Sequence, residues 1–436
     1  MKSILGHSDR RQELKGRGQI ARGRRGAAGA AAVAAAMAVL LAGCTAGGSG
    51  ATATSAATAA AVVGVATAAD VPVGAAAALQ FPEVGAGAVG IAAPDGSVRV
   101  LGQGGDTGTR PIASITKVIT ALVVLGEHPL ADGADQGPTI TLGQADLDVT
   151  EEVEAEDQFT EPMYSGQQVT LHDALAITLL TSANNYAESV ARWAFGSEDA
   201  YLAAARAWLA ANGLTQTTLA DASGLDPGSA SSTADLLHVA ALAHANPALV
   251  AIAGMPTYDQ PDLGTIANQN ILLGEDGVDG LKTGSTSYAG FTLLTSAVVP
   301  VGAQPVTLVA VVLATPSLDA RFASTRALLA SARAGLAQVQ LAEAGQVFGT
   351  YTLSDGRVVD AVATAPLSAV VFGDEAVTST VALDDLPSDT VAAASAGSTG
   401  ARATSGASVG QATVGQATFV VGGATLTAPL SLAAAG

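Results

Sequence analysis

The chain has 436 residues, of which 49% are hydrophobic, a formal net charge of −19 and a single cysteine. This length fits two domains better than one, and the hydrophobic content is enough for a sizeable core. The first 43 residues hold eight Lys or Arg and two acids, so the remainder carries 11 basic against 36 acidic side chains. The strongly acidic chain after residue 43 excludes nucleic acid as a partner, because phosphates require a basic face. The same negative charge disfavours electrostatic docking on anionic lipid.

Residues 1–44 are typical of an export signal. Six arginines lie within residues 10–25, and residues 26–42 are almost all small or apolar. A cationic start followed by an apolar stretch and small residues predicts export. The run ends in Leu41-Ala42-Gly43-Cys44, which resembles a bacterial lipobox and implies that Cys44 is lipidated and becomes the mature N-terminus. The alternatives are an ordinary signal peptide or a membrane span with an incidental cysteine, and an Arg-Arg pair leaves twin-arginine export open.

The rest of the chain divides by composition. Residues 45–72 contain Ala, Thr, Gly and Ser with almost no large side chains, which predicts a flexible tether. We expect folded structure to begin near Val73 and a first domain to cover residues 73–340. Residues 345–436 carry short Val- and Thr-rich runs broken by Gly, Ser and Asp, which indicates a small β-rich domain with a low-complexity loop over 392–412.

Within the first domain, hydrophobic periodicity predicts one hairpin, then helices, then strands and a last helix. A turn signal at 94–97 separates two apolar runs, and Ser232 with Asp235 resembles a capping box. The expected elements are, in chain order, a hairpin over 86–102, a helix over 113–125, a long exposed acidic loop over 132–168, helices over 171–181, 184–195, 198–212 and from 232, strands over 278–283, 290–299 and 305–314, and a helix over 317–337. This order predicts an α/β (α+β) fold, an antiparallel sheet flanked by helices with a helical insert.

Two short motifs contain the only lysines that follow the leader. The first is Ser114-Ile115-Thr116-Lys117, at the start of a predicted helix. Positions three apart on a helix lie on one face, so the Lys117 amine can approach the Ser114 hydroxyl. A serine becomes a nucleophile when a nearby base takes its proton, and a lysine can do so if desolvation or a neighbouring positive charge disfavours its ammonium form. The alternative is an ordinary helix start with a surface lysine.

The other motifs supply polar groups further along the chain. Ser182-Ala183-Asn184 lies between two predicted helices, where a hydroxyl and an amide could face the first serine, although Ser and Asn are also common helix caps. Lys282-Thr283-Gly284 lies on a predicted strand. Its lysine and threonine offer a charge and a hydroxyl to a terminal carboxylate, and Gly284 leaves room for a substrate backbone. Each motif alone is weak, but the ordered set is far rarer by chance.

These three motifs, separated by 68 and 100 residues, together resemble those of penicillin-binding proteins and class A β-lactamases. The longer segments 110–117, 221–225 and 278–284 look like those of D-alanyl-D-alanine carboxypeptidases, the low-molecular-mass penicillin-binding proteins. The resemblance covers roughly residues 80–340. It implies a β-lactamase/transpeptidase-like fold and a serine-type carboxypeptidase that removes the terminal D-alanine of peptidoglycan stem peptides.

The resemblance also implies the chemical steps of the reaction. Ser114 attacks the carbonyl of the penultimate D-alanine, and Lys117 is the base that activates it. Ser182 and Lys282 pass a proton to the leaving D-alanine. Water then releases the acyl-enzyme.

Substrate binding is implied in the same way. Asn184 holds the acyl side chain, Thr283 binds the terminal carboxylate, and Gly284 leaves room for the substrate. The backbone N–H groups of the nucleophile and Ser285 form an oxyanion hole. Arg321 is a second candidate anchor for the carboxylate. The chain departs from the family where residue 183 is Ala rather than Gly or Asp, and where residue 285 is Ser rather than His.

No metal or organic cofactor is implied. The expected partners are peptidoglycan stem peptides, β-lactams and, through the lipid on Cys44, the extracytoplasmic face of the bacterial cell membrane, with the protein a monomer. The alternatives on the same site are a D,D-endopeptidase, a transpeptidase and a β-lactamase. The last is disfavoured because no Glu-x-x-Leu-Asn segment lies between Ser182 and Lys282. An inactive muropeptide-binding lipoprotein is the alternative from another functional class.

Overall fold

A computed structural model describes residues 61–71, 74–395 and 413–433. These residues belong to one compact unit, Thr58–Gly436. The predicted export signal with Cys44, and most of the predicted low-complexity loop, lie outside the described residues. No single helix in the described part of the chain is both long and apolar enough to span a membrane. One pair of helices, α6 (Thr233–His244) and α7 (Pro247–Ala253), reaches that length and apolar content together, but the two meet at a bend of 101°.

The centre of the first domain is a five-stranded antiparallel sheet in the order β11-β12-β13-β3-β4. The predicted hairpin forms β3 (Ala86–Ala92) and β4 (Val98–Gly105), and the three predicted strands form β11 (Val278–Thr286), β12 (Gly290–Val301) and β13 (Gln304–Thr315). The two groups join where β13 pairs with β3, with Ala310 opposite Val89. The sheet therefore unites the two ends of the domain and leaves the helical segment between them as an insert, as the sequence predicts.

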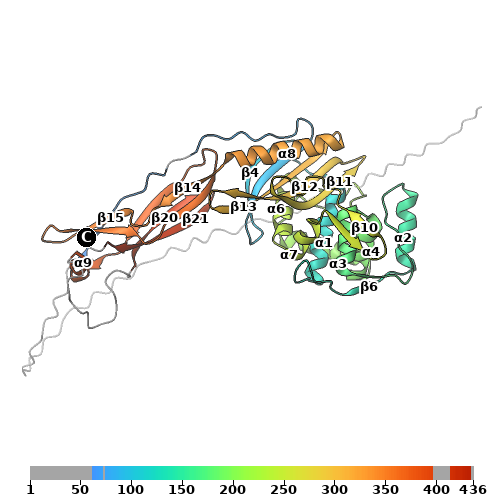
Figure 1. Ribbon diagram of the computed structural model, residues 1–436, viewed down its shortest axis with the longest axis horizontal. Coiled ribbons are helices and arrows are strands. Elements are labelled where there is room, and N and C mark those ends of the chain that lie inside the picture. The colour runs from blue at the N-terminus through green and yellow to red at the C-terminus, as the bar shows by residue number, and fades with distance from the viewer. Residues whose placement is uncertain (1–60, 72–73, 396–412, 434–436) are drawn as a thin grey trace, which may run out of the picture. The chain divides into compact units, whose positions relative to one another are not determined.

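Both faces of this sheet are buried. Leu308, Ala310 and Val312 of β13 belong to the apolar cluster beneath α8 (Leu318–Gly335), whereas the alternate residues Val309 and Val311 belong to the cluster shared with the other helices. Because side chains alternate between the faces of a strand, a continuous apolar run such as 308–313 marks a strand covered on both sides. Figure 1 shows α8 on one side of the sheet and α1, α3, α4 and α6 on the other.

The helices of the insert largely agree with prediction. They are α1 (Thr116–Glu127), α3 (Leu171–Ala176) continued by the turn η2 (Ile177–Thr181), α4 (Asn184–Phe195), α5 (Glu198–Ala211), α6 and the unpredicted α7. Ser232 caps α6 by accepting the backbone N–H of Asp235 at 3.2 Å, which confirms the cap. Short two-stranded sheets join these helices: β5 (Arg110–Pro111) with β8 (Ala230–Ser231), β6 (Thr139–Thr141) with β7 (Gln168–Thr170), and β9 (Thr257–Gln260) with β10 (Gly264–Ala267).

The prediction of a long exposed loop over 132–168 is wrong. Its middle forms α2 (Gln144–Ala155), a helix that begins after Gly143. Val149 and Val153, one turn apart, are the two buried residues of α2, and α2 packs against α4. A stripe this narrow among many acids gives little helical periodicity in the sequence, so the contact with α4, rather than local pattern, sustains the helix.

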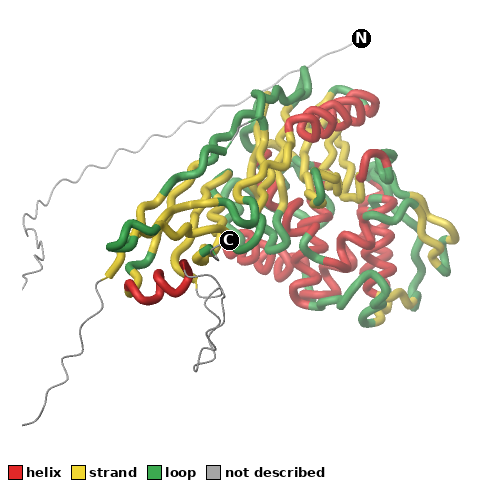
Figure 2. Tube along the Cα trace, turned by 60° about the vertical axis from the view of Figure 1, so that its left-hand side comes forward, coloured by secondary structure: helices red, strands yellow, loops and turns green. Residues whose placement is uncertain are grey.

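The C-terminal region is rich in strands, as predicted. Its six-stranded sheet has the order β18-β20-β21-β16-β15-β2, and Figure 2 shows the contrast between these strands (yellow) and the helix-rich part of the chain (red). The elements of the region are β14 (Leu336–Ala342), β15 (Val347–Thr352), β16 (Val358–Ala363), β17 (Leu367–Phe372), β18 (Thr378–Leu383), β19 (Leu386–Pro387), α9 (Ser388–Ser395), β20 (Thr413–Val421) and β21 (Ala424–Leu432). A separate apolar cluster, including Phe348, Tyr351 and Phe419, forms its core.

The prediction that the tether extends to residue 72 is also wrong. Residues 61–66 form two short strands: β1 (Ala61–Val62) pairs with β19, and β2 (Gly64–Ala66) pairs with β15. Composition misses them because Val62 alone of these residues is buried. The strands are held by backbone pairing with partner strands that lie more than 280 residues later in the chain. Folded structure therefore begins before Val73.

Candidate active site

Ser114 lies in the short turn η1 (Ala113–Ile115), immediately before α1. Its neighbour Ala113 has a φ of +49°, a left-handed conformation that non-glycine residues rarely adopt. The turn is enclosed on two sides, because a Cβ added at Gly224 would collide with the Ala113 carbonyl, and one added at Gly284 would lie 3.0 Å from the Ser114 amide nitrogen. The nucleophile candidate therefore stands between the 221–225 loop and strand β11.

The Lys117 amine is the centre of the site. Its Nζ donates to Ser114 Oγ at 2.9 Å, to Asn184 Oδ1 at 2.7 Å and to the Ser223 carbonyl at 2.7 Å. An ammonium has three protons, so these three acceptors satisfy it completely. The side chain is fully buried, which confirms that Lys117 is not a surface lysine, and its placement on the first turn of α1 brings it to Ser114 as the i,i+3 spacing predicts.

The electrostatic surroundings of Lys117 favour loss of its proton. Burial lowers the pKa of Lys117 from 10.5 to about 7, although the charges of Asp221 and Glu188 oppose the shift. Desolvation penalises the ammonium form more than the amine. At neutral pH a large fraction of Lys117 is therefore a neutral amine, which can accept the proton of the Ser114 hydroxyl.

The second motif occupies the corner between η2 and α4. Ser182 has a φ of +70° and stands just before α4, whose first residue is Asn184. Both ends of the Asn184 side chain are engaged, since Oδ1 accepts from Lys117 and Nδ2 donates to the Phe159 carbonyl at 2.8 Å. Ser182 is 9% exposed, and its hydroxyl makes no hydrogen bond to Ser114 or Lys117 among the contacts that the structure describes.

Strand β11 brings the third motif past the nucleophile. Gly284 is required there, because a Cβ would lie 2.6 Å from Thr292 Oγ1 as well as close to Ser114. Lys282 and Thr283 are 1% and 2% exposed, and Thr283 Oγ1 donates to Gln269 Oε1 at 3.3 Å. Ser285 is exposed beyond them.

Lys282 and Arg321 bring two further buried nitrogen groups to the site. Lys282 Nζ and Arg321 Nε are buried and have no hydrogen-bond partner in the described part of the chain. Burial, followed by the nearby charges of Lys117 and Arg321, holds the pKa of Lys282 far below the usual lysine value. Arg321 comes from α8; its Nη1 donates to the Gly284 carbonyl at 3.4 Å and its guanidinium lies 4.3 Å from the centre of the Phe322 ring. An incoming carboxylate would satisfy these donors.

The loop at 221–225 is built around one carboxylate. Asp221 accepts the backbone N–H groups of Gly224 at 2.9 Å and Leu225 at 2.6 Å and the Ser223 hydroxyl at 2.8 Å. These bonds fix the turn that presents the Ser223 carbonyl to Lys117. This turn accounts for the residues at 221–225 that resemble those of D-alanyl-D-alanine carboxypeptidases.

Sequence reasoning missed Glu188 and Gln269. Glu188 is 7% exposed, and its Oε1 accepts the Ala222 N–H at 3.2 Å. Burial, followed by the charges of Asp221 and Glu198, raises the pKa of Glu188 to about 7. It lies four residues after Asn184 on α4, so helical spacing places both on one face, and that spacing was the signal available in the sequence. Gln269 lies in a loop and gives no such signal.

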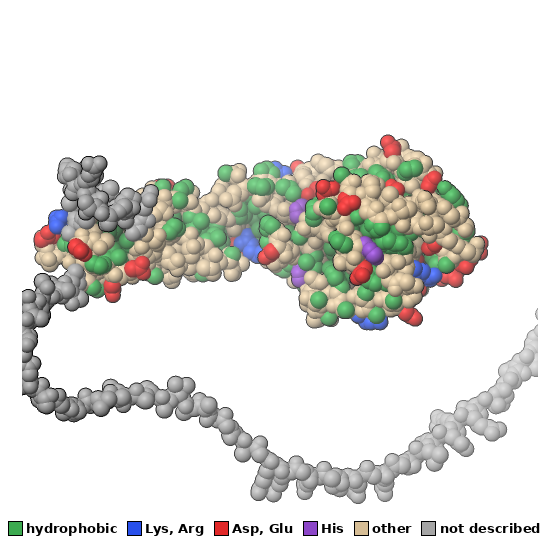
Figure 3. Space-filling view, turned by 90° about the horizontal axis from the view of Figure 1, so that it is seen from below, with side chains coloured by type: hydrophobic (Ala, Val, Ile, Leu, Met, Phe, Trp, Pro, Cys, Tyr) green, Lys and Arg blue, Asp and Glu red, His purple; other side chains and the backbone are tan. Residues whose placement is uncertain are grey.

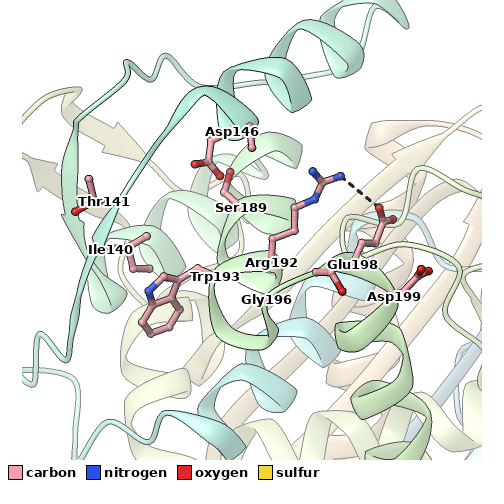
Figure 4. Close-up of a pocket in the computed structure, with 11 residues that line it drawn as sticks. Ile140, Thr141, Asp146, Ser189, Arg192, Trp193, Gly196, Glu198 and Asp199 are labelled. Carbon is pink, nitrogen blue, oxygen red and sulfur yellow. Dashed lines mark hydrogen bonds and ion pairs between the residues drawn. The ribbon is translucent and has the colours of Figure 1, made fainter.

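A cavity of about 550 Å³ at the far end of α4 contains none of the motif residues. Figure 4 shows Arg192 and Trp193 of α4 in its wall, with the Arg192 guanidinium turned toward Glu198. The residues brought together around Ser114 are instead Lys117, Asn184 and Gly284. This cluster holds a serine hydroxyl beside a buried amine, and Lys282 and Arg321 offer nitrogen donors nearby. Such an arrangement is suited to acyl transfer on a substrate that carries a carboxylate.

Comparisons with known proteins agree with this geometry. The chain is 30% identical over 210 residues to D-alanyl-D-alanine carboxypeptidase DacC of Escherichia coli, covering 46% of this chain and 50% of the relative. It is 29% identical over 259 residues to D-alanyl-D-alanine carboxypeptidase DacD of Salmonella typhimurium, covering 58% and 64%. The chain thus spans between half and two thirds of the length of these curated relatives.

Solved structures share the fold. Penicillin-binding protein 5 of Haemophilus influenzae matches with a TM-score of 0.54 at 20% identity, over 82% of this chain and 97% of that one. PBP3 of Streptococcus pneumoniae matches with a TM-score of 0.59 at 20% identity, over 82% and 100%. The Streptomyces K15 DD-transpeptidase matches with 0.51 at 22%, over 59% and 99%. These likenesses confirm the predicted fold class.

The match to a family model is the broadest evidence of relationship. The model described as D-alanyl-D-alanine carboxypeptidase, peptidase S11, matches residues 76–317. This range contains Ser114, Lys117, Ser182, Asn184 and Lys282, and it is more than half of the 436 residues. The chain therefore belongs to the D-alanyl-D-alanine carboxypeptidase family, peptidase S11.

Proposed function

We propose that this protein is a serine-type carboxypeptidase that removes the terminal D-alanine of peptidoglycan stem peptides through an acyl-enzyme on Ser114. The observation that carries the proposal is the contact of 2.9 Å between Lys117 Nζ and Ser114 Oγ, made by a lysine that is fully buried. Burial supplies the neutral amine that a serine nucleophile requires.

The acylation step follows from these positions. Neutral Lys117 takes the proton of Ser114 Oγ as that oxygen attacks the carbonyl of the penultimate D-alanine. The backbone N–H groups of Ser114 and Ser285 stabilise the oxyanion, which is consistent with the close approach of β11 to Ser114 at Gly284. The C–N bond then breaks, and the leaving amine takes a proton through Ser182 and Lys282. Water hydrolyses the remaining ester.

Substrate binding would use the buried nitrogen donors of Lys282 and Arg321. We assign the terminal carboxylate to Thr283, Lys282 and Arg321, since the last two have buried nitrogen atoms without partners in the described part of the chain. Asn184 orients Lys117 through Oδ1 and would present Nδ2 to the acyl portion of the substrate once Phe159 gives way. β-Lactams, which carry a similarly placed carboxylate, would acylate the same serine.

The test is covalent labelling of the full chain by a fluorescent penicillin, with Ser114→Ala as the matched control. We expect a labelled band that requires Ser114, and release of D-alanine from a peptide ending in D-Ala-D-Ala. A folded protein that neither labels nor cleaves the peptide would be a binding protein instead. An adduct that clears within seconds would favour a β-lactamase, and transfer to an added amine would favour a transpeptidase.

We also propose that the protein is exported and held at the extracytoplasmic face of the membrane by lipid on Cys44. The support is the sequence of residues 1–44, together with a family whose substrate lies outside the cytoplasm. Metabolic labelling with a fatty-acid probe should mark the wild type and not Cys44→Ala, and the variant should move to the soluble fraction. Equal labelling of both proteins would exclude this anchor.

A further inference from the structure

Lys117 is held by acceptors on two separate segments, which must keep their relative positions for the site to persist. Asn184 Oδ1 belongs to the first residue of α4, and the Ser223 carbonyl belongs to the 221–225 turn. The Lys117 amine can keep both contacts, at 2.7 Å each, only while the turn stays fixed against α4.

Glu188 joins these two segments. It comes from α4, and its Oε1 accepts the N–H of Ala222 in the turn at 3.2 Å. The carbonyl of Ala222 accepts the Thr120 hydroxyl at 2.7 Å. The peptide groups on both sides of Ala222 are therefore tied, one to α4 and one to α1, directly before the carbonyl that accepts from Lys117.

The carboxylate of Glu188 is more than this hydrogen bond requires. The side chain is 7% exposed, and its Oε2 has no hydrogen-bond partner among the described residues. The nearby Ser223 hydroxyl donates to Asp221 Oδ2 at 2.8 Å instead. A glutamine could accept the Ala222 N–H equally well without the cost of bringing a charge into the interior. The negative charge of Glu188 therefore needs an explanation besides the hydrogen bond.

The charge of Glu188 acts on Lys117. Burial lowers the pKa of Lys117, and the charges of Asp221 and Glu188 oppose that shift. Asp221 also holds the turn together, since it accepts the backbone N–H groups of Gly224 and Leu225. Glu188 makes one described hydrogen bond, which an amide can replace, so its charge can be removed without loosening the turn.

We propose that Glu188 is a positioning residue for the base Lys117. Its carboxylate fixes the 221–225 turn to α4, which keeps both acceptors of the Lys117 amine in place, and its negative charge stabilises the ammonium form and so strengthens the base. The inference rests on the proposed function, in which neutral Lys117 takes the proton of Ser114. A stronger base removes that proton more readily, so Glu188 maintains a base strength that burial alone would reduce.

Other ionisable groups surround this pair. Arg192 of α4 is paired with Glu198 of α5 at 3.4 Å, and Lys282 of β11 lies within electrostatic reach of Lys117. The remaining groups around Glu188 are Glu152 and Glu156 of α2, Tyr201 of α5, Asp221, Asp226 and Tyr288. Because a substitution at Glu188 leaves all of them in place, a change in the pH profile reports the loss of this one carboxylate.

The experiment measures the rate constant for acylation by a fluorescent penicillin from pH 5 to pH 9 in the wild type, Glu188→Gln and Glu188→Ala. Glutamine keeps an acceptor for the Ala222 N–H, so we expect a plateau rate within about threefold of wild type. Removing the charge lowers the pKa of Lys117, so the pH of half-maximal rate should fall by about half a unit or more. Alanine also leaves the Ala222 N–H without its acceptor, so its plateau rate should fall at least about tenfold, as expected when a catalytic group is displaced.

Glu127→Gln is the matched control, because it removes one negative charge from the exposed far end of α1, the helix that carries Lys117. Its plateau rate and half-maximal pH should equal those of the wild type. Circular dichroism establishes that each variant is folded, and the profile of Glu188→Gln decides the proposal even where Glu188→Ala does not fold.

An unchanged half-maximal pH in folded Glu188→Gln would overturn the proposal, as would a wild-type plateau rate in folded Glu188→Ala. Either result, in the presence of normal labelling of the wild type at Ser114, defeats only this inference. A wild type that takes no label and cleaves no peptide defeats the proposed function as well.

Discussion

Lys117 is a buried side chain that combines satisfied hydrogen bonds with a lowered pKa. Three acceptors satisfy its ammonium form, which offsets much of the cost of removing the charge from water. Desolvation nevertheless destabilises the ammonium form enough to lower the pKa of Lys117 to about 7. The local spacing of Ser114 and Lys117 allowed this pair to be predicted from the sequence, whereas the contact of Lys117 with the Ser223 carbonyl could not be, because it joins residues 106 positions apart through the tertiary fold.

The acylation rate should depend on the protonation of Lys117. Because the protonated amine cannot accept the Ser114 proton, the rate constant for penicillin acylation should rise with pH and reach half its maximum near pH 7, the value about which Lys117 titrates. Stopped-flow measurements from pH 5 to pH 9 would check this. A rate that stays flat across that range, in a protein that still labels at Ser114, would show that Lys117 is not the base.

At the scale of elements, the site depends on where β11 and α4 begin and how closely they approach η1. Hydrophobic patterns predicted β11, β12, β13 and α8 because long, buried elements have a clear period. They failed for α2, whose buried stripe is only Val149 and Val153. Patterns also say nothing of the close approach of Gly284 to Ser114, since a glycine in a strand gives no information about the atoms opposite it.

Gly284→Ala should slow acylation strongly without unfolding the protein. The added Cβ would lie 2.6 Å from Thr292 Oγ1 and 3.0 Å from the Ser114 amide nitrogen, so β11 must move away from the nucleophile. A displacement of this kind costs about 100-fold in rate. The rate of penicillin labelling measures acylation, and circular dichroism measures whether the protein is still folded.

The matched control is Gly126→Ala on α1, where an added Cβ meets no atom within 4 Å. We expect wild-type labelling and a stability gain of about 0.5–1 kcal/mol from the better helix propensity of alanine. Wild-type labelling by Gly284→Ala as well would show that the clash is relieved elsewhere and that the close approach is not required.

At the scale of the whole molecule, the described residues contain apolar clusters on both faces of the five-stranded sheet and a separate cluster that includes Val62 and residues between 341 and 432. We propose that the catalytic and β-rich regions are distinct domains, with residues 61–66 belonging to the second. Acidic side chains (red) outnumber basic ones (blue) on the face shown in Figure 3, in keeping with the negative net charge. The sequence predicted this division by composition, but it could not reveal the pairing of residues 61–66 with strands so distant in the chain.

Phe348→Ala should destabilise the β-rich region alone. Phe348 is fully buried and meets Phe419 edge to face, with ring centres 6.0 Å apart, and its truncation should cost about 3–5 kcal/mol. We expect the calorimetric transition of that region to move to a lower temperature. The temperature above which penicillin no longer labels Ser114 should stay unchanged. Leu328→Ala, on the buried face of α8, should do the reverse, and identical shifts in both variants would contradict two separate domains.

The pairing of β2 with β15 determines where a membrane anchor would pull on the protein. If Cys44 carries lipid, the first described residue that follows it is Ala61, which belongs to the β-rich region rather than to the five-stranded sheet. The intervening 16 residues can span at most about 60 Å in any conformation. If the proposed activity and anchor hold, the length of this segment limits how far from the anchor the active site can reach stem peptides of the wall.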